Sequence, residues 1–288
     1  MRSRGERECV IIGFGCGHGA RDRGCADGPR VLRRSGLLER LQVRAPATEW
    51  LELEPADVLA APGAVVAELC DRLTGEVASA LRRHRFPIVV GGDHSMARGT
   101  WSGVRRALPE AESFRLLWLD AHMDCHSPET SPSGALHGMP LASLLGHGGR
   151  AKAMLAPADV SLIGIRSWEP EEAAFADQLG LHRVPMAAVA ARGLAAILAG
   201  AAGDREGRYG VSIDLDVIDP VDAPGTGTPV HGGIAAATLL EAIGPLLRSR
   251  RCLALEIAEF DPHRDGDGRT AALVEALVFA AITPGETP

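Results

Sequence analysis

Acidic and imidazole side chains follow several short apolar runs of this sequence. They lie in the stretches GGDHS (91–95), DAHMD (120–124), DLDVIDP (214–220) and EIAEFDP (256–262). The candidates for chemistry are His94, Asp120, His122, Asp124, Asp214, Asp216 and Glu259. Carboxylates and imidazoles are the groups that ligate divalent cations and that transfer protons. These stretches therefore indicate a metal site, an acid–base site, or both.

The spacing within each stretch favours a site that holds two metal ions. Asp120 and His122 are two residues apart, as are Asp214 and Asp216, and alternate residues of a strand share a face. Asp124 adds a carboxylate from the following turn. Buried together, these carboxylates would repel one another and take up protons unless cations held them. Oxygen and nitrogen ligands without thiolate suit Mn²⁺, with Fe²⁺, Co²⁺ or Ni²⁺ as other candidates.

The elements that must position these residues alternate along the chain. Strands are expected at Cys9–Phe14, Pro87–Val90, Phe114–Leu119, Val160–Ile165, Tyr209–Leu215 and Cys252–Ile257. Helices are expected at Pro62–Arg85, Ala97–Leu108, Ala187–Ala202, Ile234–Arg248 and Thr270–Ile282. Apolar strands separated by helices are typical of a parallel sheet covered on both faces. We predict one α/β domain over residues 1–288, with ligands gathered at the carboxyl ends of its strands.

Composition narrows the function classes. The chain has 288 residues, a net charge of −7 and no basic stripe, which argues against nucleic acid as a partner. Its apolar runs fall short of the roughly 18 residues that a membrane span needs. The charged start leads straight into an apolar strand, unlike a signal peptide, and the six Cys are scattered without a CxxC. We expect a cytoplasmic protein that has no membrane partner.

A glycine-rich loop follows the first expected strand. Gly15, Gly17 and Ala20 fit a degenerate GxGxxA, the pattern of dinucleotide-binding loops. Gly24 and Pro29 interrupt the sequence where a helix would have to begin to hold a pyrophosphate. The pattern therefore favours an ordinary turn over a nucleotide site.

Taken together, the motifs resemble those of the ureohydrolases, the family of arginase, agmatinase and their relatives. The resemblance rests on GGDHS, DAHMD, SIDLDVIDP (212–220) and EIAEFDP in this order, and on GARDRGCADGPRVLRRSGL (19–37). It implies an eight-stranded parallel sheet between helices, two Mn²⁺ ions and a homo-oligomer, either a trimer or a hexamer. By the same resemblance one ion is held by His94, Asp120, Asp124 and Asp214. The other is held by Asp120, His122, Asp214 and Asp216.

The resemblance also implies a reaction, the hydrolysis of a guanidino group to urea and an amine. Two cations lower the pKa of a shared water, and Asp124 passes its proton to the leaving amine. Glu259 accepts hydrogen bonds from the guanidinium, and His137 stands at the family's proton-shuttle position, with an ordinary loop histidine as the alternative. Thr228 either lines the pocket or serves a turn.

The substrate is less well defined. The loop DCHSPETSPSGALH (124–137) resembles the arginase branch, in which two Asn and a Ser bind the substrate carboxylate and an Asp binds its amino group. Here Ser133 is kept, the Asn positions hold His126 and Ala135, and Glu169 takes the place of the Asp. We favour an arginase with a rebuilt carboxylate contact. The alternatives are a ureohydrolase for another guanidino compound (a guanidino acid, agmatine or a modified arginine) and a metal-binding relative without turnover.

Overall fold

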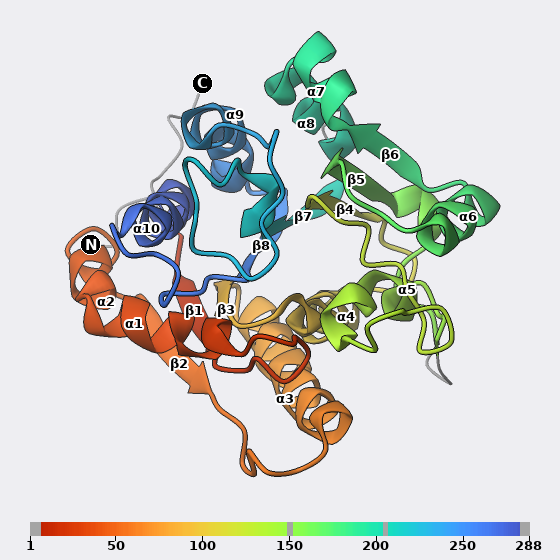
Figure 1. Ribbon diagram of the computed structural model, residues 1–288. Helices are drawn as coiled ribbons and strands as arrows, with labels where there is room; N and C mark the ends of the chain where they lie inside the picture. Colours follow the sequence, from red (N-terminus) through yellow and green to blue (C-terminus); the bar gives the residue numbers. More distant parts are fainter. Residues whose placement is uncertain (1–6, 149–151, 204–206, 283–288) are drawn as a thin grey trace.

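Eight parallel strands form a single sheet at the centre of the molecule (Figure 1). The computed structural model describes residues 7–148, 152–203 and 207–282. Across the sheet the strand order is β2-β1-β3-β8-β7-β4-β5-β6. The strands are β1 (Cys9–Phe14), β2 (Glu49–Leu53), β3 (Phe86–Gly91), β4 (Phe114–Leu119), β5 (Val160–Ile165), β6 (His182–Pro185), β7 (Arg208–Asp214) and β8 (Cys252–Ala258). This confirms the predicted α/β class and its parallel sheet.

Helices cover both faces of the sheet. They are α1 (Gly28–Arg34), α2 (Leu37–Gln42), α3 (Pro62–Arg82), α4 (Ala97–Ala107), α5 (Pro140–Leu144), α6 (Pro170–Leu179), α7 (Met186–Arg192), α8 (Leu194–Ala202), α9 (Ala236–Arg248) and α10 (Arg269–Ile282). One buried core joins α1, α2 and α7–α10 to one face, and a second joins α3–α6 to the other. Among the described residues, every helix is too short or too polar to cross a bilayer.

The central strands are buried on both sides because a helical layer covers each face. Every residue of β1, β3 and β8 is buried. The sequence prediction missed β2 and β6, which are short, lie at the two edges of the sheet and carry exposed polar residues. The helix predicted over Ala187–Ala202 is two helices, because Gly193 adopts a φ of +80° between them.

The strand order places the chemistry-bearing motifs side by side. Strands β3, β8, β7 and β4 are consecutive neighbours, and all of them run parallel. Their carboxyl ends therefore lie along one edge of the sheet. The four motifs begin at these ends.

Candidate metal centre and active site

His94 lies among three carboxylates at this edge. Its Nδ1 is 3.3 Å from Asp120 Oδ2, 3.1 Å from Asp124 Oδ2 and 3.2 Å from Asp214 Oδ2. All four side chains are buried. The imidazole stacks on Trp118, with ring centroids 4.3 Å apart. Three separate strand ends thus deliver ligand-type atoms to one point.

Asp120 connects this group to a second one. His122 Nδ1 lies 3.0 Å from Asp216 Oδ2 and 3.7 Å from Asp120 Oδ1. In each of the groups His94/Asp120/Asp214 and Asp120/His122/Asp216, one ligand atom per residue lies within 4.8 Å of the others. Asp120 belongs to both groups, so the arrangement has the form of two adjacent cation sites with a shared carboxylate.

The electrostatics of this cluster require cations or protons. His94 Nδ1 and Asp124 Oδ2 are buried and lie 3.1 Å apart, yet within the described residues neither atom makes a hydrogen bond of good geometry. Burial, and then the charge of Asp120, raises the pKa of Asp124 to about 6. Burial lowers the pKa of His122, but Asp216 and Asp120 outweigh it and raise that pKa to about 12. A buried donor set of carboxylates and imidazoles with unpaired lone pairs fits divalent metal ions.

Short turns after the strands aim these ligands. Asp93 caps the 3-10 turn His94–Met96, and its Oδ1 accepts from Ser95 N. Asp214 Oδ1 accepts from Asp216 N at the start of the next turn, Leu215–Val217. An aspartate at such a position replaces a missing backbone acceptor. The turns therefore follow from local sequence.

A buried hydrogen-bond network lies beneath His94, and the sequence analysis missed it. His94 Nε2 is 3.0 Å from Ser212 Oγ, which donates to Glu256 Oε1 at 2.6 Å. Trp101 Nε1 also donates to Glu256 Oε1, at 3.0 Å. The available signals were the position of Ser212 two residues before Asp214 and a charged residue inside the apolar strand β8.

His137 and Glu259 form a pair beside the cluster. His137 Nδ1 is 2.9 Å from Glu259 Oε1, which also accepts from His94 N at 2.9 Å. Burial lowers the pKa of His137, but the charges of Glu259 and then Asp124 raise it to about 10. Asp124 and Glu259 both adopt positive φ values, +53° and +66°. Such backbone strain in non-glycine residues gathers at functional sites.

The predicted substrate contacts separate into two groups. Thr228 Oγ1 donates to Asp216 Oδ2 at 3.1 Å, which places Thr228 against the cluster. His126 is buried, with Nε2 at 3.1 Å from Glu169 Oε2 and Nδ1 at 3.2 Å from Thr130 Oγ1. Ser133 is exposed, and its Oγ accepts from Ala135 N within the same loop. The contacts of Ser133 therefore do not connect it to the metal cluster.

Comparisons with known proteins identify the family. The Arginase family model matches residues 7–283. The arginase of Bacillus caldovelox is 35% identical over 93% of this chain and 95% of its own. That of Agrobacterium fabrum is 37% identical over 96% and 92%. This chain belongs to the arginase family.

Solved structures of the arginase family agree with the fold described above. The arginase of Bacillus caldovelox superposes with a TM-score of 0.88 over 98% of this chain and 100% of its own, at 32% identity. The Entamoeba histolytica arginase, solved in complex with L-ornithine, gives a TM-score of 0.88 over 96% and 98%, at 26% identity. The predicted resemblance is thus confirmed. Members of the arginase family are dinuclear metal enzymes, and this chain has the residue groups to hold metal.

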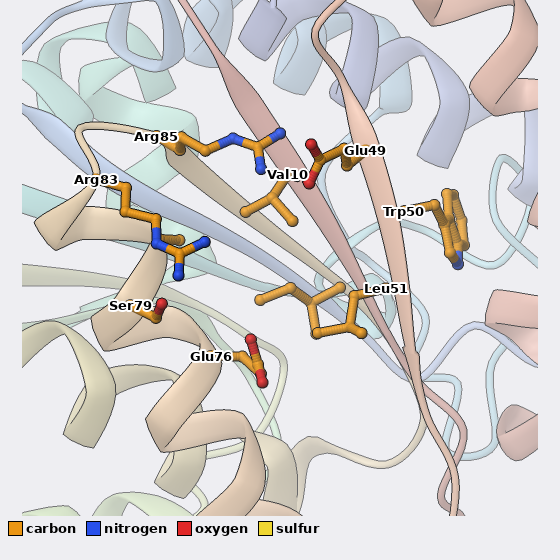
Figure 2. A pocket seen from close by; sticks show the side chains of 10 residues that line it. Val10, Glu49, Trp50, Leu51, Glu76, Ser79, Arg83 and Arg85 are labelled. Carbon is orange, nitrogen blue, oxygen red and sulfur yellow. Dashed lines mark hydrogen bonds and ion pairs between the residues drawn. The ribbon is translucent and has the colours of Figure 1, made fainter.

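A surface pocket of about 200 Å³ lies elsewhere on this arginase-family chain (Figure 2). Val10, Ile12 and Leu51 line it on the sheet, and Arg83, directly after α3, also lines it. It includes the first residue of β2, Glu49, and Arg85, which precedes β3. The pocket therefore lies toward the amino ends of the strands, away from the metal cluster.

Proposed function

We propose that this chain is a dinuclear-metal ureohydrolase that converts L-arginine to L-ornithine and urea. The observation that carries the proposal is the pair of ligand groups joined by Asp120, with the His137–Glu259 pair beside them. The names of the relatives at 35% and 37% identity support arginine as the substrate. We further infer that the metal is Mn²⁺, with Fe²⁺, Co²⁺ or Ni²⁺ as alternatives, and that the enzyme is a cytoplasmic trimer or hexamer.

The residues divide between the two ions as follows. His94 and Asp124 would bind only the first ion, and His122 and Asp216 would bind only the second. Asp120 and Asp214 would bridge the two ions, and four carboxylates would balance four positive charges. When bound, the ions would lower the pKa of a water so that hydroxide forms near neutral pH. Asp124 Oδ2, which is buried and lies 3.1 Å from His94 Nδ1, would hold the proton that this water releases.

Proton delivery to the leaving amine is assigned to His137. Nδ1 donates to Glu259 Oε1. Burial lowers the pKa of His137, but the charges of Glu259 and Asp124 raise it to about 10, so the ring is an imidazolium near neutral pH and Nε2 also carries a proton that it can donate. Glu259 Oε1 is already engaged by His94 N and His137. The guanidinium is therefore assigned to Glu259 Oε2, which faces the Gly227 backbone next to Thr228. A planar guanidinium matches a carboxylate acceptor.

A second candidate function follows from the substrate end of the site. Ala135, at one of the two Asn positions, has no side-chain donor for a substrate carboxylate. This favours, as the alternative, a ureohydrolase for a guanidino compound without an α-carboxylate, such as agmatine. A metal-binding relative without turnover is the least supported reading, because Asp124, His137 and Glu259 accompany the ligands.

Urea release from the Mn²⁺-loaded protein tests these functions. The substrates are arginine, agmatine, guanidinobutyrate and guanidinopropionate. We expect the highest kcat/KM on arginine, and an Asp124→Asn variant should lose turnover while Asp71→Asn, on the exposed face of α3, keeps it. Faster turnover of agmatine than of arginine would favour the second candidate function over that of an arginase. The absence of urea from every substrate, with two ions bound, would refute the enzyme assignment.

A further inference from the structure

One guanidinium is surrounded by backbone carbonyls next to the metal cluster. Arg166 follows β5, and its Nη2 donates to Asp216 O at 2.5 Å and to Val230 O at 2.7 Å. Its Nη1 donates to Gly164 O and Val217 O, and its Nε donates to His231 O. An arginine has five N–H donors in a rigid fork. Here that fork joins three segments that are far apart in sequence.

Two backbone hydrogen bonds also connect the segment of Arg166 directly to a segment that carries metal ligands. The backbone N of Arg166 and that of Ser167 both donate to Ala121 O, between Asp120 and His122, at 2.9 and 3.0 Å. Gly164, at a φ of +97°, lets the end of β5 approach both segments. A Cβ at Gly164 would lie 2.5 Å from Val217 Cγ2 and 3.2 Å from Asp120 O.

Several carbonyl oxygens around Arg166 depend on its guanidinium for a hydrogen-bond donor. Asp216, Val217 and Ile218 are consecutive, and their carbonyl oxygens all face this one guanidinium. Val217 O also accepts from Ile234 N at 2.9 Å, but Arg166 is the donor to Asp216 O and Ile218 O, and without it these two carbonyls would lose their partner and the turn would change shape. Asp216 would then move relative to His122 Nδ1 and Thr228 Oγ1, its neighbours at 3.0 and 3.1 Å.

We propose that Arg166 is a positioning residue for the half of the metal site that contains His122 and Asp216. The proposal rests on the proposed function only in taking that half as a metal site. The change in metal affinity that it predicts is opposite in sign to the change expected from charge alone. A nearby positive charge repels a metal cation, so removing it should tighten metal binding if charge were all that mattered. If Arg166 positions Asp216, removing it weakens binding instead.

Arg251 provides a matched control. Its guanidinium also binds backbone carbonyls, those of Gly207 at 2.7 Å, Ala202 at 2.6 Å and Gly203 at 3.1 Å. These contacts lie at the amino ends of β7 and β8, the opposite edge of the sheet from the metal cluster. Arg251→Lys therefore disturbs a similar clamp without disturbing the site.

The test is a titration of metal-free protein with Mn²⁺ alone, by calorimetry and by metal analysis after dialysis. In Arg166→Gln we expect one of two ions to bind about 10- to 100-fold more weakly, the usual effect of losing a residue that orients ligands. Arg166→Lys should recover part of that loss. The other ion, and both ions in Arg251→Lys, should bind as in the wild type.

Several results would overturn the assignment. Tighter binding in Arg166→Gln would show that Arg166 contributes charge and not position, and unchanged binding would show that it does not position Asp216. If both ions bind equally more weakly, Arg166 does not act specifically on the half that contains His122 and Asp216. If neither Arg166 variant folds while Arg251→Lys does, Arg166 serves the fold as a whole. Because no substrate is used, these outcomes are independent of whether the wild type releases urea from arginine.

Discussion

The pair between His137 and Glu259 makes a proton titration of the metal-free protein a sharp test of the site. The two side chains are 2.9 Å apart, and Glu259 is fully buried. Burial lowers the pKa of His137, while Glu259 and then Asp124 raise it from 6.5 to about 10. Glu259→Gln keeps the size of the side chain, and hence the burial, but removes the nearest negative charge. The pKa of His137 should then fall to 6.5 or lower.

The expected change is large. The difference between a pKa of 6.5 and one of about 10 corresponds to about 5 kcal/mol of interaction between the protonated imidazole and its surroundings. In the wild type the folded state keeps this proton up to about pH 10, whereas the unfolded chain gives it up near 6.5. This stability is fully present below pH 6.5 and is lost as the pH rises to about 10. In Glu259→Gln the free energy of unfolding should not show this loss as the pH rises.

Two measurements check this expectation. NMR follows the His137 ring protons, assigned by their disappearance in His137→Phe, and denaturant unfolding at pH 6 and pH 9 gives the stability difference. Glu169→Gln is the control, because Glu169 contacts His126 and not His137. A wild-type His137 that titrates near 6.5, or one that stays near 10 in Glu259→Gln, would show that the pair does not form as described.

Three further outcomes are expected. Asp120→Ala should lose both ions together, as measured by metal analysis, because this carboxylate belongs to both ligand groups; retention of one tightly held ion would refute the sharing. Ala135→Asn should lower the KM for arginine if the substrate carboxylate reaches this loop, and an unchanged KM counts against that pose. Gly210→Ala should destabilise β7 by about 1 to 3 kcal/mol in urea unfolding, since its Cβ would lie 2.2 Å from Trp101, whereas Gly200→Ala, in open space on α8, should be neutral or stabilising.

The sequence predicted the parts of the fold that periodicity and burial govern together. Strands β3, β4, β7 and β8 are apolar on both faces and end in the motifs, so both their existence and their common edge could be derived. Asp120 and His122, and likewise Asp214 and Asp216, were expected to share a face because side chains alternate along a strand. In the structure β4 ends at Leu119 and Asp216 lies in the 3-10 turn Leu215–Val217, so the turns after the strands, and not strand alternation, bring these residues together.

What could not be predicted depends on contacts between distant segments. The edge strands β2 and β6 are half exposed, so no continuous apolar run marks them. The division between α7 and α8 depends on one glycine in an otherwise helical sequence. Arg166 is an ordinary charged residue in the sequence, and its role emerges only when the carbonyls of distant segments surround it. Glu256 stands out as a charged residue inside an apolar strand, but its partners Ser212 and Trp101 come from other elements.

His126 bears on the substrate preference through the partners it already has. Its Nε2 lies 3.1 Å from Glu169 Oε2. A substrate with both an ammonium and a carboxylate can replace both partners, its ammonium at Glu169 and its carboxylate at His126. Agmatine has only the ammonium, so the buried Nε2–H would keep no acceptor closer than Glu172 Oε2 at 3.6 Å, and losing its hydrogen bond costs about 1 to 3 kcal/mol. We therefore expect kcat/KM for arginine to exceed that for agmatine by about 5- to 150-fold.

The variant His126→Ala tests this exchange. Removing the imidazole frees Glu169 and abolishes the unpaired donor, so the preference for arginine should shrink while the two ions stay bound. Thr130→Val is the control, because it removes a partner of Nδ1 and leaves the contact with Glu169 in place. If the ratio of the two kcat/KM values is the same in His126→Ala and the wild type, His126 does not take part in selecting the substrate. In that case the carboxylate contact would come from another group of the loop 126–135, such as Ser133 or the main chain.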